Sequence, residues 1–430
     1  MITALIGFVI LFALCFAGVP LAIGLLSVGV VGFASVRGFE AAGSVVGQQI
    51  TDAFSSYGFS VIPLFVLMGA FIHRAGLADD LFDSARAWLG HIRGGMAHAT
   101  IGASAAFSAV CGSSIATAAT MSRVSLPQMK RHDYDDGFAC GAVAAGGTLG
   151  ILIPPSVPLV IFGILTETDI TGLFMAALIP GLLLAFLYMC AAWLVVLWRP
   201  SLGQPARRAN WRERLATMRR TATVGLLFLI VLGGMYLGVF TPTEAAGIGA
   251  AGALIIMILR KAASWSALRG ALTEAVLTTA SLLLVVGSAL VFNTFLTISG
   301  LTAELVTLIE TLSIPPLAVI AVICGVYLLL GCVFDSLAAM ILTAPVFTPI
   351  AIGLGYDPLW FGVVVVIVVE LGLITPPLGM NVFIVKNLAP HVSVWRIFAG
   401  VSPFVAANIA GLILVIVAPV MALWLPRLLN

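Results

Sequence analysis

The polar residues of this sequence that could do chemistry lie in four short interruptions of long apolar runs. Two interruptions read CGSS (residues 111–114) and FDS (334–336), and the other two contain paired prolines, in LGILIPPSVPLVIFG (149–163) and LGLITPPLGMNVFIV (371–385). A proline pair breaks a helix, because proline has no amide hydrogen and clashes with the preceding turn. Inside a membrane, the freed backbone groups must face protein, water or a bound ion. These four places are therefore candidate binding sites.

The interruptions offer oxygen ligands that suit a small cation. Carbonyl oxygens at the end of a broken helix, beside Ser and Thr hydroxyls, can hold a small cation, and the free amides of the facing half-helix can hold an anion. We predict a first small-cation site from Gly112, Ser113, Ser114, Thr117, Pro154 and Ser156, and a second from Asp335, Ser336, Thr375, Gly379 and Asn381. A bound substrate is expected to contact Ser114, Ser156, Thr375 and Asn381. The alternative is that the prolines kink helices for packing and the hydroxyls bond to the preceding turn.

Two carboxylates beside the interruptions have open roles. Asp335 is either a sodium ligand or the N-cap of the helix that follows it. Glu370 ends the run VVVVIVVE just before the second proline pair. An ionisable group inside a membrane segment is a functional candidate, so Glu370 either binds a proton or sodium or pairs with amides of the broken helix. The structural role is slightly favoured.

Composition identifies a polytopic membrane protein. Of 430 residues, 61% are hydrophobic and 9% are charged, whereas soluble domains carry roughly a quarter charged residues. No P-loop, zinc-protease or serine-hydrolase motif is present. We therefore predict no enzyme activity, no catalytic residue, no cofactor and no metal other than sodium as a coupling ion. Nothing indicates a nucleic-acid partner, and coupling energy must come from an ion gradient or a partner.

The apolar runs predict an all-α fold. Runs long enough to cross a bilayer occupy roughly residues 2–18, 20–36, 52–73, 137–165, 173–198, 221–240, 243–259, 271–298, 358–385 and 397–425. Residues 95–131 and 315–353 instead contain two half-length segments each, which indicates re-entrant hairpins with tips at CGSS and FDS. Broken helices are expected over 137–165 and 358–385.

A fixed offset indicates an internal repeat. Pro154 and Pro376 are 222 positions apart, and the same shift places Ser114 on Ser336 and Asp135 on Asp357. We predict a first repeat over 1–198, an arginine-rich cytoplasmic loop over 199–220 and a second repeat over 221–430. Basic residues mark the cytoplasmic side, and they flank only the first hairpin. The two hairpins should therefore enter from opposite faces, as in inverted repeats.

Long motifs resemble one transporter family. VCGSSIATAATMSRVSLPQM, DYDDGFACGAVAAGGTLGILIPPSVPLVIFGILTETDI, GVFTPTEAAGIGA and ELGLITPPLGMNVFIV are similar to the large membrane subunit of tripartite ATP-independent periplasmic (TRAP) transporters, over essentially the whole chain. The resemblance implies an elevator-type fold with scaffold and transport domains, sodium symport and the two ion sites named above.

The resemblance also implies partners and a location. A separate small four-helix membrane subunit and a periplasmic substrate-binding protein would work with this chain in the bacterial inner membrane. The substrate would be a small organic acid of the dicarboxylate, 2-oxo acid or sialic acid type. Segments 20–36, 173–198 and 221–259 are candidates for the static scaffold that the small subunit contacts. The alternative function is a stand-alone ion-coupled carrier or a channel-like protein of related fold.

Overall fold

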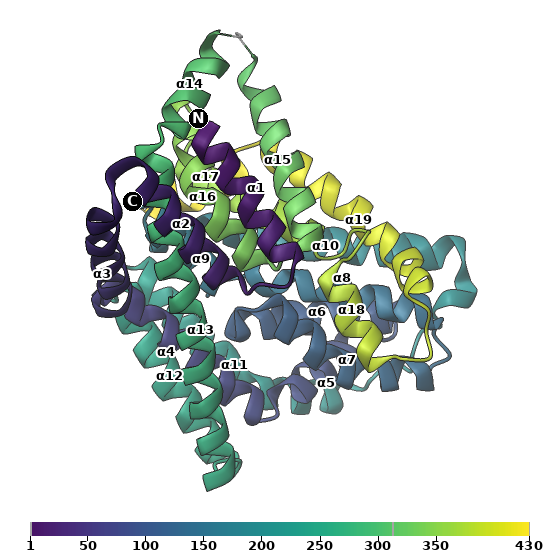
Figure 1. The fold of residues 1–430 in the computed structure, drawn as a ribbon. Helices are drawn as coiled ribbons and strands as arrows, with labels where there is room; N and C mark the ends of the chain where they lie inside the picture. Colours follow the sequence, from purple (N-terminus) through teal and green to yellow (C-terminus); the bar gives the residue numbers. More distant parts are fainter. Residues whose placement is uncertain (1, 312–313, 430) are drawn as a thin grey trace.

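The computed structural model describes residues 2–311 and 314–429, and every regular element in these ranges is helical (Figure 1). Twenty α-helices, α1 to α20, and two short 3-10 helices lie in this part of the chain. Eight described helices are long and apolar enough to cross a membrane, or nine spans when the bent pair α8 and α9 counts as one. The predicted all-α membrane fold is confirmed.

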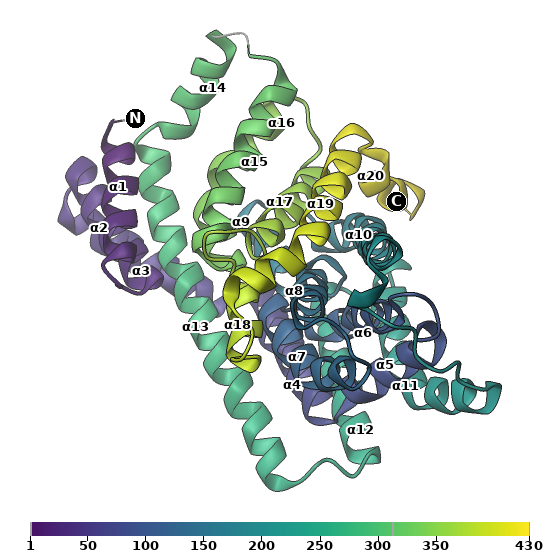
Figure 2. The ribbon, with the colours of Figure 1, turned by 90° about the vertical axis from the view of Figure 1, so that its right-hand side faces the viewer.

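Helix α13 is the longest and contacts α2, α3 and α4, while α1 packs on α2, α12 on α4 and α11 on α12; these seven helices are called here the α13 group. Figure 2 shows α13 running along one side of the molecule with α1, α2 and α3 beyond it. The members of the α13 group are α1 (Ile2–Phe16), α2 (Leu21–Arg37), α3 (Phe39–Ser55), α4 (Val61–Arg74), α11 (Trp211–Tyr236), α12 (Pro242–Leu259) and α13 (Trp265–Ile298) itself.

A second set of helices is called the α8 group: α8 contacts α6, α7, α9, α10, α17, α18 and α19, while α15 and α16 pack on α17 and α20 packs on α10. Its members are α6 (Gly95–Cys111), α7 (Ser114–Arg131), α8 (Asp136–Leu152), α9 (Val157–Leu165), α10 (Ile170–Trp198), α15 (Pro316–Val333), α16 (Ser336–Gly353), α17 (Pro358–Gly372), α18 (Met380–Leu388), α19 (Val394–Val417) and α20 (Val420–Leu429). Helix α5 (Leu77–Leu89) connects the groups by contacting α6 and α11, and α14 (Leu301–Thr311) contacts α13 and α16.

The hairpins and broken helices lie where the sequence predicts them. Helices α6 and α7 form the first hairpin, and α15 and α16 form the second. The first proline pair separates α8 from α9, which are bent by 42°, and the second separates α17 from α18. Helices α7 and α16 begin and end 222 positions apart. Asp135 and Asp357, also 222 apart, cap α8 and α17 by accepting a backbone N–H at 2.9 Å each, because a carboxylate satisfies the free amides of a first turn.

Small residues let the helices of the α8 group approach closely. All residues of α8 from Gly137 to Leu152 are buried. A Cβ atom on Gly141 would lie 2.3 Å from Gly400 O of α19, and one on Gly400 would lie 1.9 Å from Gly137 O. Backbone-to-backbone packing of this kind is how helices associate where lipid removes the hydrophobic drive.

Two expectations about boundaries are wrong. The loop over 199–220 ends early, because α11 begins at Trp211 with a capping box. In this box Asn210 Oδ1 accepts from Glu213 N at 2.8 Å, and Glu213 Oε2 accepts from Asn210 N at 3.0 Å. The single span over 397–425 is two helices, α19 and α20, which are separated at Pro419. Segment 173–198, a candidate for the scaffold, is α10, which packs mainly against α8, α19 and α20 and also contacts α11, where Tyr236 Oη donates to Phe174 O at 3.1 Å. Its place in the scaffold stays a prediction.

Candidate ion and substrate site

The first hairpin tip lies directly against the first helix break. Gly112 has φ +63°, a conformation that L side chains rarely adopt, and a Cβ atom there would lie 2.9 Å from Pro155 O and 3.6 Å from Ser156 Cα. On the other side of the tip, a Cβ atom on Gly150 would lie 2.6 Å from Ser113 O. Two glycines therefore allow the tip and the break to touch through backbone atoms alone.

The hydroxyls of the predicted first sodium site have different partners. Ser113 Oγ caps α7 by accepting from Ala116 N at 3.3 Å, and Ser156 Oγ caps α9 by accepting from Leu159 N at 3.4 Å. Ser114 Oγ donates to Glu370 Oε2 at 2.5 Å. Thr117 is fully buried, and its Oγ1 has no hydrogen-bond partner in the described part of the chain. The structure brings these residues together around the first tip and break.

The second hairpin approaches the second break in a related way. Cys332 Sγ lies 3.5 Å from Pro376 O, and a Cβ atom on Gly372 would lie 2.6 Å from the carbonyl carbon of Gly331. Asp335 Oδ1 accepts from Ala338 N at 2.9 Å, so Asp335 is the N-cap of α16. This cap occupies one carboxylate oxygen and leaves the ligand role of Asp335 as a prediction. Thr375 lies beyond the end of α17, and its Oγ1 donates to Leu371 O at 2.6 Å, a local bond to the preceding turn.

Asn381, which the prediction grouped with the second tip, packs on α8. Its Nδ2 donates to Ala144 O of α8 at 3.4 Å, and a Cβ atom on Gly147 would lie 3.0 Å from the same Nδ2. The reason is crosswise packing: α18 of the second repeat packs on α7 and α8, while α9 of the first repeat packs on α16. Each short half-helix thus contacts the hairpin of the other repeat, which the offset of 222 positions does not reveal.

Glu370 connects the two hairpin tips. Its carboxyl accepts from Ser114 of the first tip and also faces Ser336 of the second, and Ser114 and Ser336 are repeat equivalents. The open question about Glu370 is therefore answered in part, since its described partner is a serine of the first tip instead of the backbone amides of its own helix. The signal that could have placed it in the site was a carboxylate at the end of an apolar run, next to a break.

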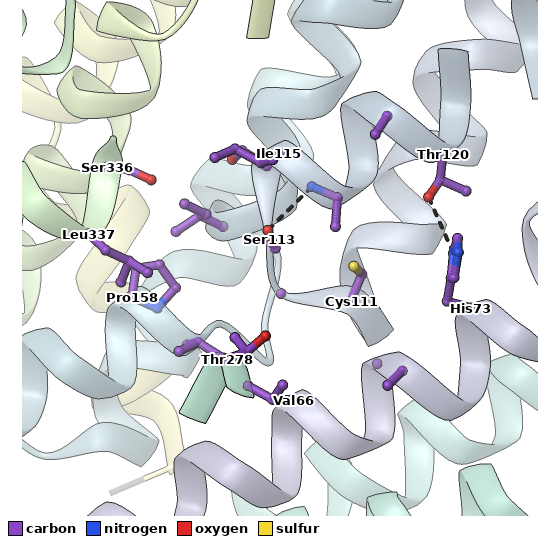
Figure 3. Close-up of a pocket in the computed structure, with 18 of the residues that line it drawn as sticks. Val66, His73, Cys111, Ser113, Ile115, Thr120, Pro158, Thr278, Ser336 and Leu337 are labelled. Atoms are coloured by element: carbon purple, nitrogen blue, oxygen red, sulfur yellow. Dashed lines mark hydrogen bonds between the residues drawn. The ribbon is translucent and has the colours of Figure 1, made fainter. Parts of the chain in front are cut away.

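A cavity of about 390 Å³ lies between the tips and the α13 group. Figure 3 shows Ser336 and Leu337 of the second tip across from Ser113 of the first, with Leu337 beside Pro158 of α9. The opposite wall comes from α4 and α13, whose lining residues include Val66, Gly69, Ala70, His73, Glu274, Thr278 and Leu282. Among the predicted substrate contacts, Ser114 lines this cavity, whereas Ser156, Thr375 and Asn381 are not part of its wall.

The cavity wall also contains polar groups that the sequence analysis did not assign. His73 Nδ1 lies 3.3 Å from Thr120 Oγ1, and Arg123 lies one turn beyond Thr120 along α7. Glu274 pairs with Arg74 at 3.0 Å. Thr120 and Arg123 lie on α7, Ser113 is its N-cap, and all three line one cavity. The seven- and three-residue spacings from Ser113 to Thr120 to Arg123 are a helical periodicity that could have been noticed in the sequence.

The two breaks differ in exposure. Residues 153–156 are buried, whereas Pro376, Pro377 and Leu378 are exposed. One break is therefore covered by protein and the other reaches the surface, although their sequences are related by the repeat.

An ion pair fastens the start of α8 to the start of α19. Arg396 Nη2 donates to Asp135 Oδ2 at 2.6 Å. Partial burial raises the pKa of the Asp135 carboxyl, but the hydrogen bond from Arg396 and the capped Phe138 amide outweigh it and hold that pKa below its ordinary value.

The donor set around the tips fits a small hard cation. The described residues contain no group of three or more His, Cys, Asp or Glu side chains that could hold a metal ion. The tips instead present carbonyl and hydroxyl oxygens together with two orphaned buried oxygens, Thr117 Oγ1 and Glu370 Oε1. Oxygen donors of this kind suit sodium and do not suit softer metals.

Comparison with known proteins now identifies the family. The family model described as "Tripartite ATP-independent periplasmic transporter, DctM component" matches residues 8–421. The chain belongs to this family. It is therefore a membrane transport subunit and not an enzyme, and the recognition made from its motifs is confirmed.

Individual relatives agree with the DctM assignment. The C4-dicarboxylate TRAP transporter large permease protein DctM of Pseudomonas aeruginosa is 35% identical over 383 residues, 89% of each chain. The sialic acid TRAP transporter large permease protein SiaM of Vibrio cholerae is 33% identical over 382 residues, again 89% of each chain. The solved YdaH transporter of Alcanivorax borkumensis has a TM-score of 0.65, covers 99% of this chain and 98% of its own, and is 15% identical, which shows a shared fold alone.

Proposed function

We propose that this DctM-family subunit imports a small organic acid across the bacterial inner membrane by sodium symport. A periplasmic binding protein would deliver the substrate, and a small four-helix membrane subunit would be its partner. The names of two relatives, for a C4-dicarboxylate and a sialic acid transporter, support a carboxylic acid as the substrate class.

The observation that carries the proposal is the direct contact of each hairpin with the helix break of its own repeat. Gly112 against Pro155 and Cys332 against Pro376 bring free backbone oxygens and hydroxyls together inside the α8 group. In a lipid setting such broken backbone is tolerated where it lines a binding site. The second predicted site is revised to Asp335, Ser336, Thr375 and Gly379, since Asn381 packs on α8.

An elevator movement would carry the site across the membrane. The α8 group contains both hairpins and both broken helices, and it meets the α13 group along α4 and α13, where the cavity lies. The cavity extends from the tips along α7 to Arg123 and along α4 to His73, next to Arg74, which the positive-inside rule assigns to the cytoplasm. On this topology the described state opens the site to the cytoplasm.

Uptake into proteoliposomes tests the proposal. The subunit, the small membrane subunit and the soluble protein encoded with it are reconstituted, and uptake of labelled succinate and sialic acid is measured with an inward sodium gradient or an equal potassium gradient. Uptake that needs sodium and all three proteins is expected. Uptake by this chain alone would contradict the tripartite proposal and support a stand-alone carrier or channel.

A pair of serine variants on α7 tests the ion site. Ser114 and Ser122 are both buried, but Ser114 bonds across to Glu370 and Ser122 bonds to Ala118 O of its own helix at 2.7 Å. Ser114→Ala is expected to lose sodium-dependent uptake, and Ser122→Ala is expected to retain it. Equal sodium dependence in the two variants would contradict a cation site at the first tip.

A further inference from the structure

Glu370 is a carboxylate in an apolar part of the molecule. It lies in the last turn of α17, is 1% exposed, and follows a run of buried valine and isoleucine residues. Its Oε2 accepts the Ser114 hydroxyl at 2.5 Å, and its Oε1 has no hydrogen-bond partner among the described residues. The proposed function does not require this residue, so its position calls for a separate explanation.

The geometry around Glu370 joins the repeats at equivalent points. Ser114 and Ser336 are the first helical residues after the first and second hairpin tips, and one carboxyl group faces both. The repeat counterpart of Glu370, Thr148, has other partners: its hydroxyl donates to Ala145 O at 2.7 Å and lies 2.8 Å from Tyr188 Oη. The residue that connects the two tips, Glu370, thus comes from the second repeat, and its counterpart in the first repeat does not make this connection.

Electrostatics favours a cation next to this carboxylate. A buried charge is unfavourable unless it is paired and hydrogen-bonded. The ion pairs recorded in the described part of the chain join other residues: Arg74–Glu274, Arg86–Asp83, Arg260–Asp80, His391–Asp136 and Arg396–Asp135. The groups that do face Glu370 are neutral hydroxyls, namely Ser114, Ser336 and, at longer range, Tyr188. A small cation held by the tips would supply the missing positive charge.

We propose that Glu370 is the shared anionic group of the two predicted sodium sites and makes them bind cooperatively. A sodium ion at either tip would hold the carboxylate ionised and fixed between Ser114 and Ser336, so the second ion would find its anionic ligand already in place. The inference rests on the proposed sodium coupling and adds to it the residue that connects the ions. Thermodynamic coupling of this kind is reciprocal, since each ion must raise the affinity for the other by the same factor.

Sodium-dependent thermal stability tests the role of Glu370 without a transport assay. The purified 430-residue chain is titrated with sodium chloride at constant ionic strength, with potassium as the balancing ion, and the rise of the unfolding midpoint gives the affinity and the Hill coefficient. For the wild type we expect a Hill coefficient near 2, because there are two coupled sites. Glu370→Gln keeps the shape and an acceptor for Ser114 but removes the charge. It is expected to lower the Hill coefficient to about 1 and to raise the half-saturating sodium concentration at least about fivefold.

Two further variants separate this role from a structural one. Ser336→Ala keeps the carboxylate and its bond to Ser114, and it is expected to lower the Hill coefficient even if Glu370→Gln does not fold. Thr148→Val removes a buried hydroxyl at the repeat-equivalent position, and it is expected to lower stability without sodium while leaving the sodium midpoint unchanged.

The outcomes distinguish the two proposals. If sodium and potassium stabilise the wild type equally, the sodium coupling in the proposed function is wrong. If the wild type responds to sodium and either Glu370→Gln or Ser336→Ala keeps its midpoint and Hill coefficient, sodium coupling stands and the role of Glu370 is overturned.

Discussion

Replacing Gly112 by alanine tests whether the first hairpin tip must touch the first break. Gly112 has φ +63°, and an added Cβ atom would lie 2.9 Å from Pro155 O. Holding an L residue in this left-handed conformation costs roughly 1–2 kcal/mol. The close contact adds a second cost of roughly 1–3 kcal/mol, typical of overpacking, because the atom that must move belongs to the backbone of the break.

Gly76 provides the matched control. It precedes α5 with φ +70°, and a Cβ atom there would have no neighbour within 4 Å. Gly76→Ala therefore carries the conformational cost without the contact. The difference between the two variants isolates the contact between tip and break, and we expect Gly112→Ala to lower the thermal unfolding midpoint more than Gly76→Ala does.

The functional consequence is measured by sodium titration. If about 1.4 kcal/mol of the contact energy is relieved by the tip moving away from Pro155, sodium affinity at the first site falls about tenfold. The assay is the sodium concentration for half-maximal stabilisation and for half-maximal uptake in each variant. Equal losses of stability and equal sodium midpoints in Gly112→Ala and Gly76→Ala would refute the reasoning. Such a result would mean that the tip accommodates a Cβ atom at Gly112, where the structure leaves no space for one.

Three further predictions concern the packing that supports the site. Asp135→Asn keeps the cap of α8 but removes the charge that pairs with Arg396. Because the pKa of Asp135 is lowered in the folded state, the stabilisation by this charge is present above the unfolded carboxyl pKa of about 3.9 and is lost as the pH falls through the lower folded value. The difference in unfolding midpoint between Asp135→Asn and the wild type should therefore shrink between pH 7 and pH 3. Gly372→Ala would place a Cβ atom 2.6 Å from the backbone of α15 and should lower the free energy of unfolding by roughly 1–3 kcal/mol or prevent folding. Its control, Gly325→Ala, has no neighbour within 4 Å and should raise the free energy of unfolding by about 0.5–1 kcal/mol. Equal unfolding midpoints in the two variants would contradict the close packing. Tyr188→Phe removes the hydroxyl that accepts from the buried Asn408 amide at 2.8 Å. The unpaired amide should lower the free energy of unfolding by roughly 1–3 kcal/mol and leave the sodium midpoint unchanged. A changed sodium midpoint would show that this network reaches the ion sites.

Several features of the fold were predictable because their causes are local. Paired prolines end a helix wherever they occur, so the breaks at Pro154 and Pro376 follow from the residues themselves. The tips are equally local, since Ser113 and Asp335 cap the helices that follow them. Helix α11 was predicted to start too late, because the apolar run begins after residue 220 while the capping box at Asn210 starts the helix ten residues earlier.

The composition of the site depended on contacts across the chain. Asn381 was grouped with the second tip because it follows the second break, but crosswise packing of α18 on α7 and α8 moves it to the first repeat. Glu370 and Ser114 are 256 positions apart, and no sequence spacing links them. The same is true of the cavity, whose walls come from hairpin tips, α4 and α13.

The sequence by itself determined the class of protein, the places where helices break and cap, and the repeat that relates the two halves, because hydropathy, proline and capping residues act within a few positions of the chain. The tertiary structure decided which half-helix faces which hairpin, which break is covered, and that Glu370 joins both tips. Those features depend on glycine-mediated backbone contacts between distant helices, and close packing of this kind is settled by three-dimensional fit and not by local preference.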